Sequence, residues 1–353
     1  MVGVPSMKSG QRKEELMKES RREFLKQAGI AGAGAVAAGC ATTASMNVST
    51  PARRVAGGPM ARGMTLVSMM SDGSPGLGVK TDRGVLDVKR AAAQLGSAAP
   101  TTTDDVIRYG DGGLGELVRA CSGHAALWVA ESSVRFAPCV VNPEKIVCVG
   151  LNYARHARET NNPIPKLPIL FNKFNNALNC HQGTVAVSKI TEAKNFDYES
   201  ELVIVMGRTA SNVSEADALS YVFGYCNGND FSARDLQSRS SQWMIGKTCD
   251  GFGLLGPYLV TADLVNPNNL QIVGTVNGEV RQNSNTSDMV FNCAQIIAYT
   301  SKLMTLQPGD IIYTGTPEGV INGYPKEKQV WLKPGDRLTT TIGNLGTLSF
   351  SLT

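Results

Sequence analysis

The segment that decides the fold is Asp197-Tyr198-Glu199-Ser200-Glu201-Leu202-Val203-Ile204-Val205. It places two carboxylates two residues apart within a run that is otherwise typical of a buried β-strand. Alternate residues of a strand point to the same face, so we expect Glu199 and Glu201 to lie side by side. Two buried like charges need a positive partner or a shared proton, and a divalent cation is the simplest partner. An edge strand with its polar face in water is the alternative for an isolated pair of this kind.

A second polar cluster lies about thirty residues further on, in Gly224-Tyr225-Cys226-Asn227-Gly228-Asn229-Asp230-Phe231-Ser232-Ala233-Arg234-Asp235. It ends a short apolar run, and Asp230 can supply a third carboxylate. Three carboxylates with neither Cys nor His form a hard oxygen site, which suits Mg²⁺ or Mn²⁺, with Ca²⁺ as a further candidate, rather than zinc or copper. We therefore expect Glu199, Glu201 and Asp230 to hold a catalytic ion, with the remaining positions left to water and substrate.

The composition is that of a soluble globular protein of 353 residues. The net charge of +4 comes from residues 1–62, which hold ten Lys or Arg against four acids, so that 24 basic and 26 acidic residues remain from Gly63 onward. The folded part is nearly neutral and has no basic stripe. We therefore expect no nucleic-acid partner.

The N-terminal segment Ser20-Arg21-Arg22-Glu23-Phe24-Leu25-Lys26 precedes a weakly apolar run that is too short to span a bilayer. It resembles a twin-arginine export signal, which predicts a signal peptide over 1–44, a linker over 45–62, the export machinery as a partner and a periplasmic location. The letters Ala37-Ala38-Gly39-Cys40 also resemble a lipoprotein box. Only lipidation of Cys40 would then anchor the protein to a membrane.

Two regions follow the linker. Residues 63–140 predict a small α+β unit, with a hairpin around Asp82-Arg83-Gly84 and helices over Val88–Leu95, Thr103–Tyr109 and Leu114–Cys121. Residues 141–353 contain many short β-rich runs separated by Gly, Pro, Asn and Asp. Their only convincing helices are Glu215–Phe223, with Ser214 as its N-cap, and Phe291–Leu303. The expected fold class is mainly β (α+β), with a sandwich or barrel-like core.

A candidate base lies near the start of the second region, in Gly150-Leu151-Asn152-Tyr153-Ala154-Arg155-His156-Ala157-Arg158-Glu159. Residues three apart on a helical turn face the same way, so Glu159 can orient His156. Such a pair suits a general base that acts on water or on a substrate C–H. An exposed histidine on a surface helix is the alternative.

Further polar residues can surround a substrate. Lys247 and Arg234 can hold a substrate carboxylate or a developing enolate near the cation. The Gly-rich turn that begins at Gly315 can present backbone N–H groups and the Thr316 hydroxyl to an anion, although such a segment by itself is more often only a turn.

The order of these motifs resembles the fumarylacetoacetate hydrolase family over about Lys145–Thr353, and Met64–Val140 more weakly resembles the family's variable N-terminal unit. The motifs are N-Y-x-x-H-x-x-E, D-Y-E-x-E-L, N-D-x-S-A-R-D-x-Q, G-K-x-x-D, V-N-G-E-x-R-Q-x-S-N-T-S-D-M and P-G-D-x-I-x-T-G-T-P-x-G-V.

This resemblance implies a β-sandwich roll, a homodimer and a site for Mg²⁺ or Mn²⁺ at Glu199, Glu201 and Asp230. It also implies a lid that brings His156 and Glu159 over a bound 2-oxo acid, which is surrounded by the side chains of Lys247, Arg234, Gln237 and Thr316.

Family members hydrolyse C–C bonds, decarboxylate oxaloacetate, or isomerise and hydrate unsaturated oxo-diacids. The His156–Glu159 pair favours C–C hydrolysis of an acylpyruvate-like or fumarylpyruvate-like acid through a metal-chelated enolate. The alternatives are an oxaloacetate-type decarboxylase, a 2-hydroxyhepta-2,4-diene-1,7-dioate-type isomerase or hydratase, and an exported ligand-binding protein without catalysis. A dinucleotide site is not expected, because the G-x-G-x-x-G match at Gly110–Gly115 follows a helix-like segment rather than a strand.

Overall fold

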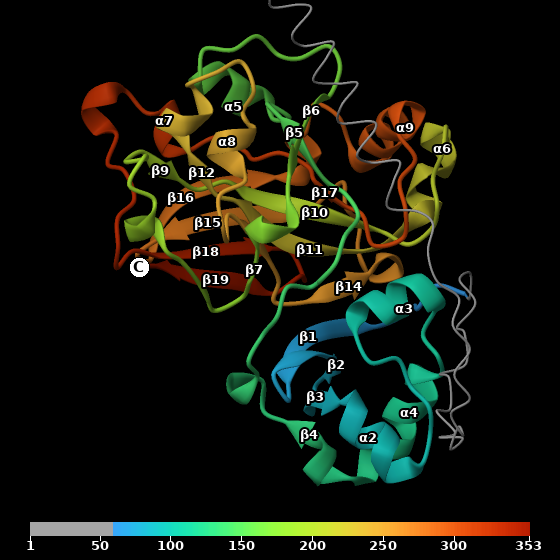
Figure 1. Cartoon of the computed structure of the whole chain (residues 1–353). Helices are drawn as coiled ribbons and strands as arrows, with labels where there is room; N and C mark the ends of the chain where they lie inside the picture. The colour runs from blue at the N-terminus through green and yellow to red at the C-terminus, as the bar shows by residue number, and fades with distance from the viewer. Residues whose placement is uncertain (1–58) are drawn as a thin grey trace, which may run out of the picture. The chain divides into compact units, whose positions relative to one another are not determined.

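Short β-strands dominate residues 59–353, which are the residues that this computed structural model describes. The predicted signal peptide, most of the predicted linker and Cys40 lie outside them. Ten strands run side by side in a twelve-stranded sheet (Figure 1). In spatial order they are β4 (Trp128–Val129), β3 (Gly84–Asp87), β2 (Ser74–Thr81), β1 (Thr65–Ser71), β14 (Leu259–Thr261), β11 (Val222–Asp230), β10 (Ser200–Met206), β17 (Ile311–Tyr313), β5 (Ile146–Gly150) and β6 (Ile169–Lys173).

The other two strands of this sheet branch from β11. β13 (Gly253–Leu255) pairs with β11, and β7 (Leu178–Cys180) pairs with β13. The pairing of β1 with β14 joins the predicted N-terminal unit to the rest of the sheet. The predicted domain boundary near residue 140 stays a prediction.

A second sheet of five strands packs on the first. Its strands, in spatial order, are β16 (Glu279–Asn285), β15 (Gln271–Val276), β18 (Arg337–Ile342), β19 (Thr347–Leu352) and β8 (Gly183–Val185). Alternate residues of β15, β18 and β19 are buried, which is the period of two that a half-covered strand requires. Ile272 and Ile342 from this sheet share one hydrophobic core with Leu202 and Ile204 of β10.

A two-stranded pair, β9 (Phe196–Asp197) with β12 (Ser232–Ala233), completes the sheets. The predicted mainly β, α+β fold is therefore confirmed as two packed sheets with short helices. No closed barrel forms within residues 59–353.

The helices of the N-terminal region begin and end close to the predicted residues. They are α2 (Val88–Leu95), α3 (Thr103–Tyr109) and α4 (Leu114–Ala120), and their apolar side chains pack with those of β1 and β2. The side chain of Asp87 accepts a hydrogen bond from Arg90 N at the start of α2. The turn between β2 and β3 falls at Asp82 and Arg83, as predicted.

The remaining helices are short, apart from α9 (Cys293–Leu303). They are α5 (Ala154–Glu159), α6 (Glu215–Ala218), α7 (Arg234–Gln237) and α8 (Met244–Lys247). Ser214 caps α6 as predicted, but the helix predicted to reach Phe223 ends much earlier. Strand β11 begins at Val222, because the β-branched and aromatic residues there pair with β10 instead.

Strand β10 lies inside the large sheet between β11 and β17, and all seven of its residues are buried. The alternative of an edge strand that faces water is therefore excluded. The carboxylates on this strand must find their partners inside the protein.

A buried carboxylate fixes the start of β17. Asp310 is fully buried and accepts hydrogen bonds from the backbone N–H groups of Gln307 and Lys145, each at 2.8 Å. Lys145 directly precedes β5, so this carboxylate joins the beginnings of two parallel strands.

Replacement of Asp310 by Ala should therefore lower the free energy of unfolding by about 3 kcal/mol, because two buried N–H donors lose an ionised acceptor. Urea denaturation followed by circular dichroism measures this change. The exposed residue Asp82 provides the control, since Asp82→Ala should change the free energy of unfolding by less than about 0.5 kcal/mol. Equal effects of the two substitutions would contradict this account of Asp310.

Candidate active site

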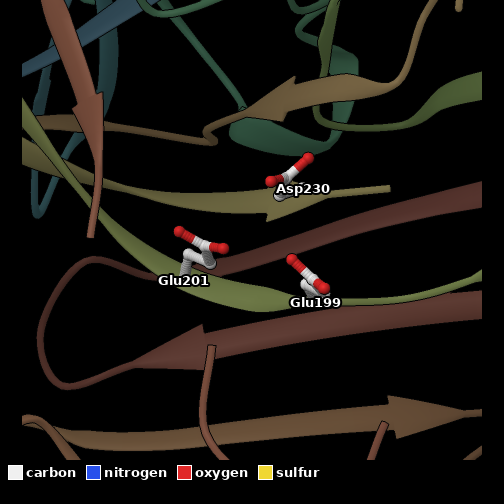
Figure 2. Close-up of side chains that lie close together, drawn as sticks. All are labelled: Glu199, Glu201 and Asp230. Atoms are coloured by element: carbon white, nitrogen blue, oxygen red, sulfur yellow. The ribbon is translucent and has the colours of Figure 1, made fainter. Parts of the chain in front are cut away.

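Strand pairing brings the three predicted metal ligands together. Glu199 directly precedes β10, Glu201 lies on β10, and Asp230 is the last residue of β11. The antiparallel register pairs Glu201 with Gly228, and Asp230 N donates to Glu199 O at 2.9 Å. Figure 2 shows the three carboxylates turned toward one another, and each offers an oxygen within 4.8 Å of the others. All three are buried.

Three buried cations surround two of these carboxylates. Lys247 Nζ lies 2.7 Å from Glu199 Oε2 and 3.2 Å from Asp230 Oδ2. Arg234 Nη2 lies 2.7 Å from Glu199 Oε1, and Lys173 Nζ lies 2.5 Å from Asp230 Oδ1. Glu199 and Asp230 therefore each have two cationic neighbours, and Lys247 is common to both.

The pKa values of the two glutamates shift in opposite directions. Burial by itself would raise the pKa of Glu199, but Lys247 and Arg234 outweigh it and lower this pKa to about 2. Burial raises the pKa of Glu201 well above its usual value, and the nearby charges of Asp230 and Glu199 raise it further. Glu201 receives one backbone hydrogen bond, from Gly315 N at 2.7 Å. Positive charge is therefore deficient at Glu201.

A divalent cation fits this deficiency. The donors are three carboxylates whose oxygens converge, with no nitrogen or sulfur ligand among them, which suits Mg²⁺ or Mn²⁺. A bound cation would also favour the ionised form of Glu201. Glu199, Glu201 and Asp230 are thus the residues of the described chain that could hold such an ion.

The predicted contact between the candidate base His156 and its carboxylate partner Glu159 is formed. His156 and Glu159 both lie on α5, and His156 Nδ1 is 2.8 Å from Glu159 Oε1. Gly319 N donates to Glu159 Oε2 at 2.9 Å, and Gly323 packs so close to the Glu159 carboxyl group that a Cβ atom would lie 2.4 Å from its Cδ. An ionised carboxylate only accepts hydrogen bonds, so His156 Nδ1 is the donor in this contact, and in the neutral imidazole Nε2 is then the nitrogen with the lone pair. His156 is 5% exposed, which excludes an exposed surface histidine.

One cavity of about 180 Å³ brings most of the predicted residues to a common surface. Six of the nine predicted site residues line it, namely His156, Glu199, Arg234, Gln237, Lys247 and Thr316. The other three are one contact away: Glu159 lies against His156, while Glu201 and Asp230 belong to the carboxylate cluster with Glu199. The apolar part of the wall includes Phe171 and Trp243, whose rings meet edge to face at 5.5 Å.

The backbone N–H groups of the Gly-rich turn bind carboxylates of the protein itself. The N–H groups of Gly315 and Gly319 donate to Glu201 and Glu159, respectively. The Thr316 hydroxyl donates to Ser200 O at 3.0 Å rather than into the cavity. The turn therefore orients a candidate metal ligand and the partner of the candidate base.

Three buried residues of this region were missed in the sequence. Lys173 neutralises Asp230, Asp197 accepts from Arg234 Nε at 2.9 Å, and Gln282 contacts Thr316 at 2.8 Å. Asp197 begins the segment quoted first and Gln282 belongs to a family motif, but neither pattern indicates a partner. Lys173 carries one usable signal, since a lysine that ends an apolar strand is unusual in a buried position.

The sequence of this chain matches a known protein family. The sequence profile of the fumarylacetoacetate hydrolase C-terminal domain matches residues 145–353. The chain belongs to the fumarylacetoacetate hydrolase family. It is 37% identical over 310 residues to a mitochondrial oxaloacetate tautomerase from Xenopus laevis, covering 86% of this chain and 94% of that protein. A mitochondrial oxaloacetate tautomerase from Homo sapiens is 38% identical over 279 residues, covering 78% and 86% of the two chains.

Solved structures of this family share the fold. The crystal structure of a putative HpcE protein from Mycobacterium smegmatis has a TM-score of 0.69 and 33% identity, covering 82% of this chain and 99% of that one. A fumarylpyruvate hydrolase from Pseudomonas aeruginosa, in complex with Mn²⁺ and pyruvate, has a TM-score of 0.54 and 31% identity, covering 60% and 91%. The family thus includes both isomerising and hydrolysing enzymes, and at least one member that binds a divalent metal.

The predicted periplasmic location is wrong in the light of the two similar oxaloacetate tautomerases, which are named as mitochondrial proteins rather than exported ones. The prediction depended on paired arginines before a weakly apolar run, and basic N-terminal segments occur in several classes of targeting sequence. Among residues 59–353, no helix has the length and apolar character needed to cross a membrane.

Replacement of Glu201 by Gln tests the charge deficiency. Without metal, the variant should melt on the order of 2 °C higher than the wild type, because folding no longer has to protonate Glu201 or bury its charge beside two carboxylates, and an amide oxygen still accepts from Gly315 N. Mn²⁺ should raise the melting temperature of the wild type but not of the variant. Differential scanning fluorimetry with and without chelator measures both effects.

The matched control is Glu116→Gln, which changes an exposed glutamate and should leave both melting temperatures unchanged. An equal Mn²⁺-dependent shift in the Glu201→Gln variant and the wild type would refute the assignment of Glu201 as a ligand.

Proposed function

We propose that this chain is a divalent-metal-dependent enzyme that interconverts the keto and enol forms of a small 2-oxo dicarboxylic acid of the oxaloacetate type. The observation that carries the proposal is the cavity that joins a buried histidine base to a cluster of three carboxylates. A protein that only binds ligands has no need of such a base.

The relatives support a small acid of the oxaloacetate type. Oxaloacetate tautomerases are similar to this chain over most of its length. The cavity of about 180 Å³ is smaller than the roughly 300–1,000 Å³ of sites for drug-sized ligands, and it has room for a four-carbon acid. It shares Arg234, Gln237 and Trp243 with a second hollow of about 870 Å³, so its volume does not exclude a longer acid.

The cations of the wall can bind the acid. Arg234 and Lys247 line the cavity, and the adjacent carboxylates favour their charged forms. Burial alone would lower the pKa of Lys247, but Asp230 and Glu199 outweigh it and raise this pKa. Arg234 also donates through Nη1 to Gln237 Oε1 at 2.9 Å, which fixes the amide at the cavity wall. These groups attract the substrate carboxylates and stabilise negative charge that develops on the 2-oxo oxygen.

The proton transfer needs only one base. His156 Nε2 takes a proton from C3 of the keto acid, the C2–C3 double bond forms, and the 2-oxo oxygen gains a proton from water. The hydroxide that remains takes the proton from the His156 imidazolium, which gives the enol and regenerates the base. The reverse sequence returns the keto form. Glu159 stabilises the imidazolium that forms in between. A divalent cation at Glu199, Glu201 and Asp230 would supply polarisation of the 2-oxo group, which makes the C3 proton more acidic.

C–C hydrolysis of a small acylpyruvate is the second candidate. It is favoured by the similar fumarylpyruvate hydrolase, which contains Mn²⁺ and pyruvate. In that reaction His156 would take a proton from water, and the resulting hydroxide would attack the distal carbonyl. The C–C bond would then break, its electrons would pass to C3 of pyruvate, which takes the proton back from the imidazolium, and the distal part would leave as a carboxylic acid. A homodimer, as the family resemblance implies, belongs to the same proposal.

Replacement of His156 by Gln should lower kcat for enol-to-keto conversion of oxaloacetate by about 10²–10⁴-fold and change KM much less, because the base is lost while the cations remain. Loss of the ultraviolet absorbance of the enol measures the rate. His124 is exposed, so His124→Gln is the control and should keep wild-type activity. Wild-type kcat in the His156→Gln variant would sink the assignment of the base.

Analysis of the reaction products distinguishes a tautomerase from a hydrolase. With oxaloacetate and Mg²⁺ or Mn²⁺, the wild type should consume the enol without releasing pyruvate or CO₂. Acetylpyruvate and fumarylpyruvate should be cleaved more slowly, as followed by chromatography of pyruvate and the released acid. Faster release of pyruvate from an acylpyruvate than enol consumption would favour the hydrolase over the tautomerase.

A further inference from the structure

One glutamine links the five-stranded sheet to the candidate site. Gln282 lies on β16, at the edge of that sheet, and its side chain is fully buried. Its Oε1 accepts from Ser200 N at 2.9 Å, and its Nε2 donates to Thr316 Oγ1 at 2.8 Å and to Pro317 O at 2.9 Å. The amide orientation is unambiguous, because Ser200 N–H can only donate and Pro317 C=O can only accept.

The first contact fixes the backbone between the two glutamates. Ser200 is the residue that separates Glu199 from Glu201, and its N–H bonds to the side chain of Gln282. Close packing from the second sheet makes the contact possible: a Cβ atom on Gly274 would lie 2.5 Å from Ser200 Oγ and 3.0 Å from Gln282 Oε1. Rotation of the Ser200 peptide would move both glutamates, so this bond sets the distance between their carboxylates.

The second contact fixes the hydroxyl of Thr316, which lines the cavity. This hydroxyl gives its only proton to Ser200 O and accepts one hydrogen bond from Gln282. One lone pair remains, so Thr316 can accept a hydrogen bond from a group in the cavity but cannot donate one. An enol hydroxyl or a water can meet this oxygen favourably, whereas a carboxylate cannot.

We infer that Gln282 is a positioning residue of the active site with two separable effects. Through the Ser200 peptide it holds Glu199 and Glu201 at the spacing for the metal, and through Nε2 it commits the Thr316 hydroxyl to act as an acceptor toward a substrate O–H. The inference depends on the proposed metal site and the proposed tautomerase reaction.

The alternative role for Gln282 is purely structural, namely to hold the two sheets together by hydrogen bonds. Asn227 provides the matched comparison, because it is also a fully buried amide and its Nδ2 donates to Leu345 O and Gly346 O, each at 3.0 Å, in the turn between β18 and β19 of the second sheet. Among the described residues, no side-chain hydrogen bond joins Asn227 to Glu199, Glu201 or Thr316. Gln282→Met and Asn227→Leu thus each remove buried amide hydrogen bonds between the two sheets, but only Gln282→Met removes contacts with residues of the candidate site.

The first test is Mn²⁺ affinity by isothermal titration calorimetry, with thermal stability measured on the same samples. Gln282→Met should weaken Mn²⁺ binding about 10–100-fold, as loss of a residue that orients metal ligands does. Asn227→Leu should lower the melting temperature and leave the Mn²⁺ dissociation constant within about 2-fold of the wild-type value. If both variants lose stability and both keep wild-type Mn²⁺ affinity, Gln282 is only a tie between sheets and the inference fails.

The second test is a double-mutant cycle with Thr316→Val on the KM for enol oxaloacetate at saturating Mn²⁺. Gln282→Met and Thr316→Val should each raise KM, and the double variant should have the KM of Thr316→Val, because Gln282 acts on the substrate only through Thr316. Multiplicative effects of the two substitutions would overturn the link between Gln282 and Thr316.

Gln282→Glu keeps the inference testable if Gln282→Met does not fold. A carboxylate retains an acceptor for Ser200 N but lacks the donors to Thr316 and Pro317, so it should raise KM while Mn²⁺ still binds; an unchanged KM would count against the inference. Failure of the proposed function looks different, since the wild type itself would then bind no Mn²⁺ or convert no enol.

Discussion

The structure depends on a cluster of buried carboxylates that its own cations do not fully neutralise. Asp197, Glu199, Glu201 and Asp230 are all buried, and the buried cations among them are Lys173, Arg234 and Lys247. The remaining negative charge falls on Glu201, whose pKa is raised by burial and by its acidic neighbours. Burial of such a charge is costly unless a cation binds. A site with this imbalance is prepared for a divalent ion and for an anionic substrate beside it.

The fold holds this charge in place with elements that are far apart in the sequence. β10 and β11 supply the three carboxylates, the turn after β17 supplies backbone N–H groups, and α5 supplies the base. Because Gly315 and Gly319 bind Glu201 and Glu159, one turn orients both the candidate metal site and the candidate base. The two places are therefore connected through a short stretch of backbone.

Local patterns in the sequence were enough for the strand character of β10, the shared face of Glu199 and Glu201, and the His156–Glu159 contact, because periods of two and three to four residues determine which side chains are neighbours. The bounds of α2 and α3 were also predicted, and the structure shows that the side chains of Asp87 and Thr102 cap their N-termini. Lys173 and Gln282 could not be predicted in the same way. Lys173 reaches Asp230 from β6 at the far edge of the sheet order, and Gln282 reaches Ser200 from a different sheet, so only the tertiary structure brings them together. The basic N-terminus misled the prediction of location because its pattern is shared by different targeting signals.

The most direct measurement of the central claim is an anomalous-difference map from crystals of this protein soaked with Mn²⁺ and oxalate, an unreactive mimic of the 2-oxo acid. The account predicts one strong peak in contact with an oxygen from each of Glu199, Glu201 and Asp230, with oxalate on the side of the ion that faces His156 and Lys247. A carboxylate cluster that stays free of Mn²⁺ at saturating concentration, or a peak bound only by other residues, would contradict it.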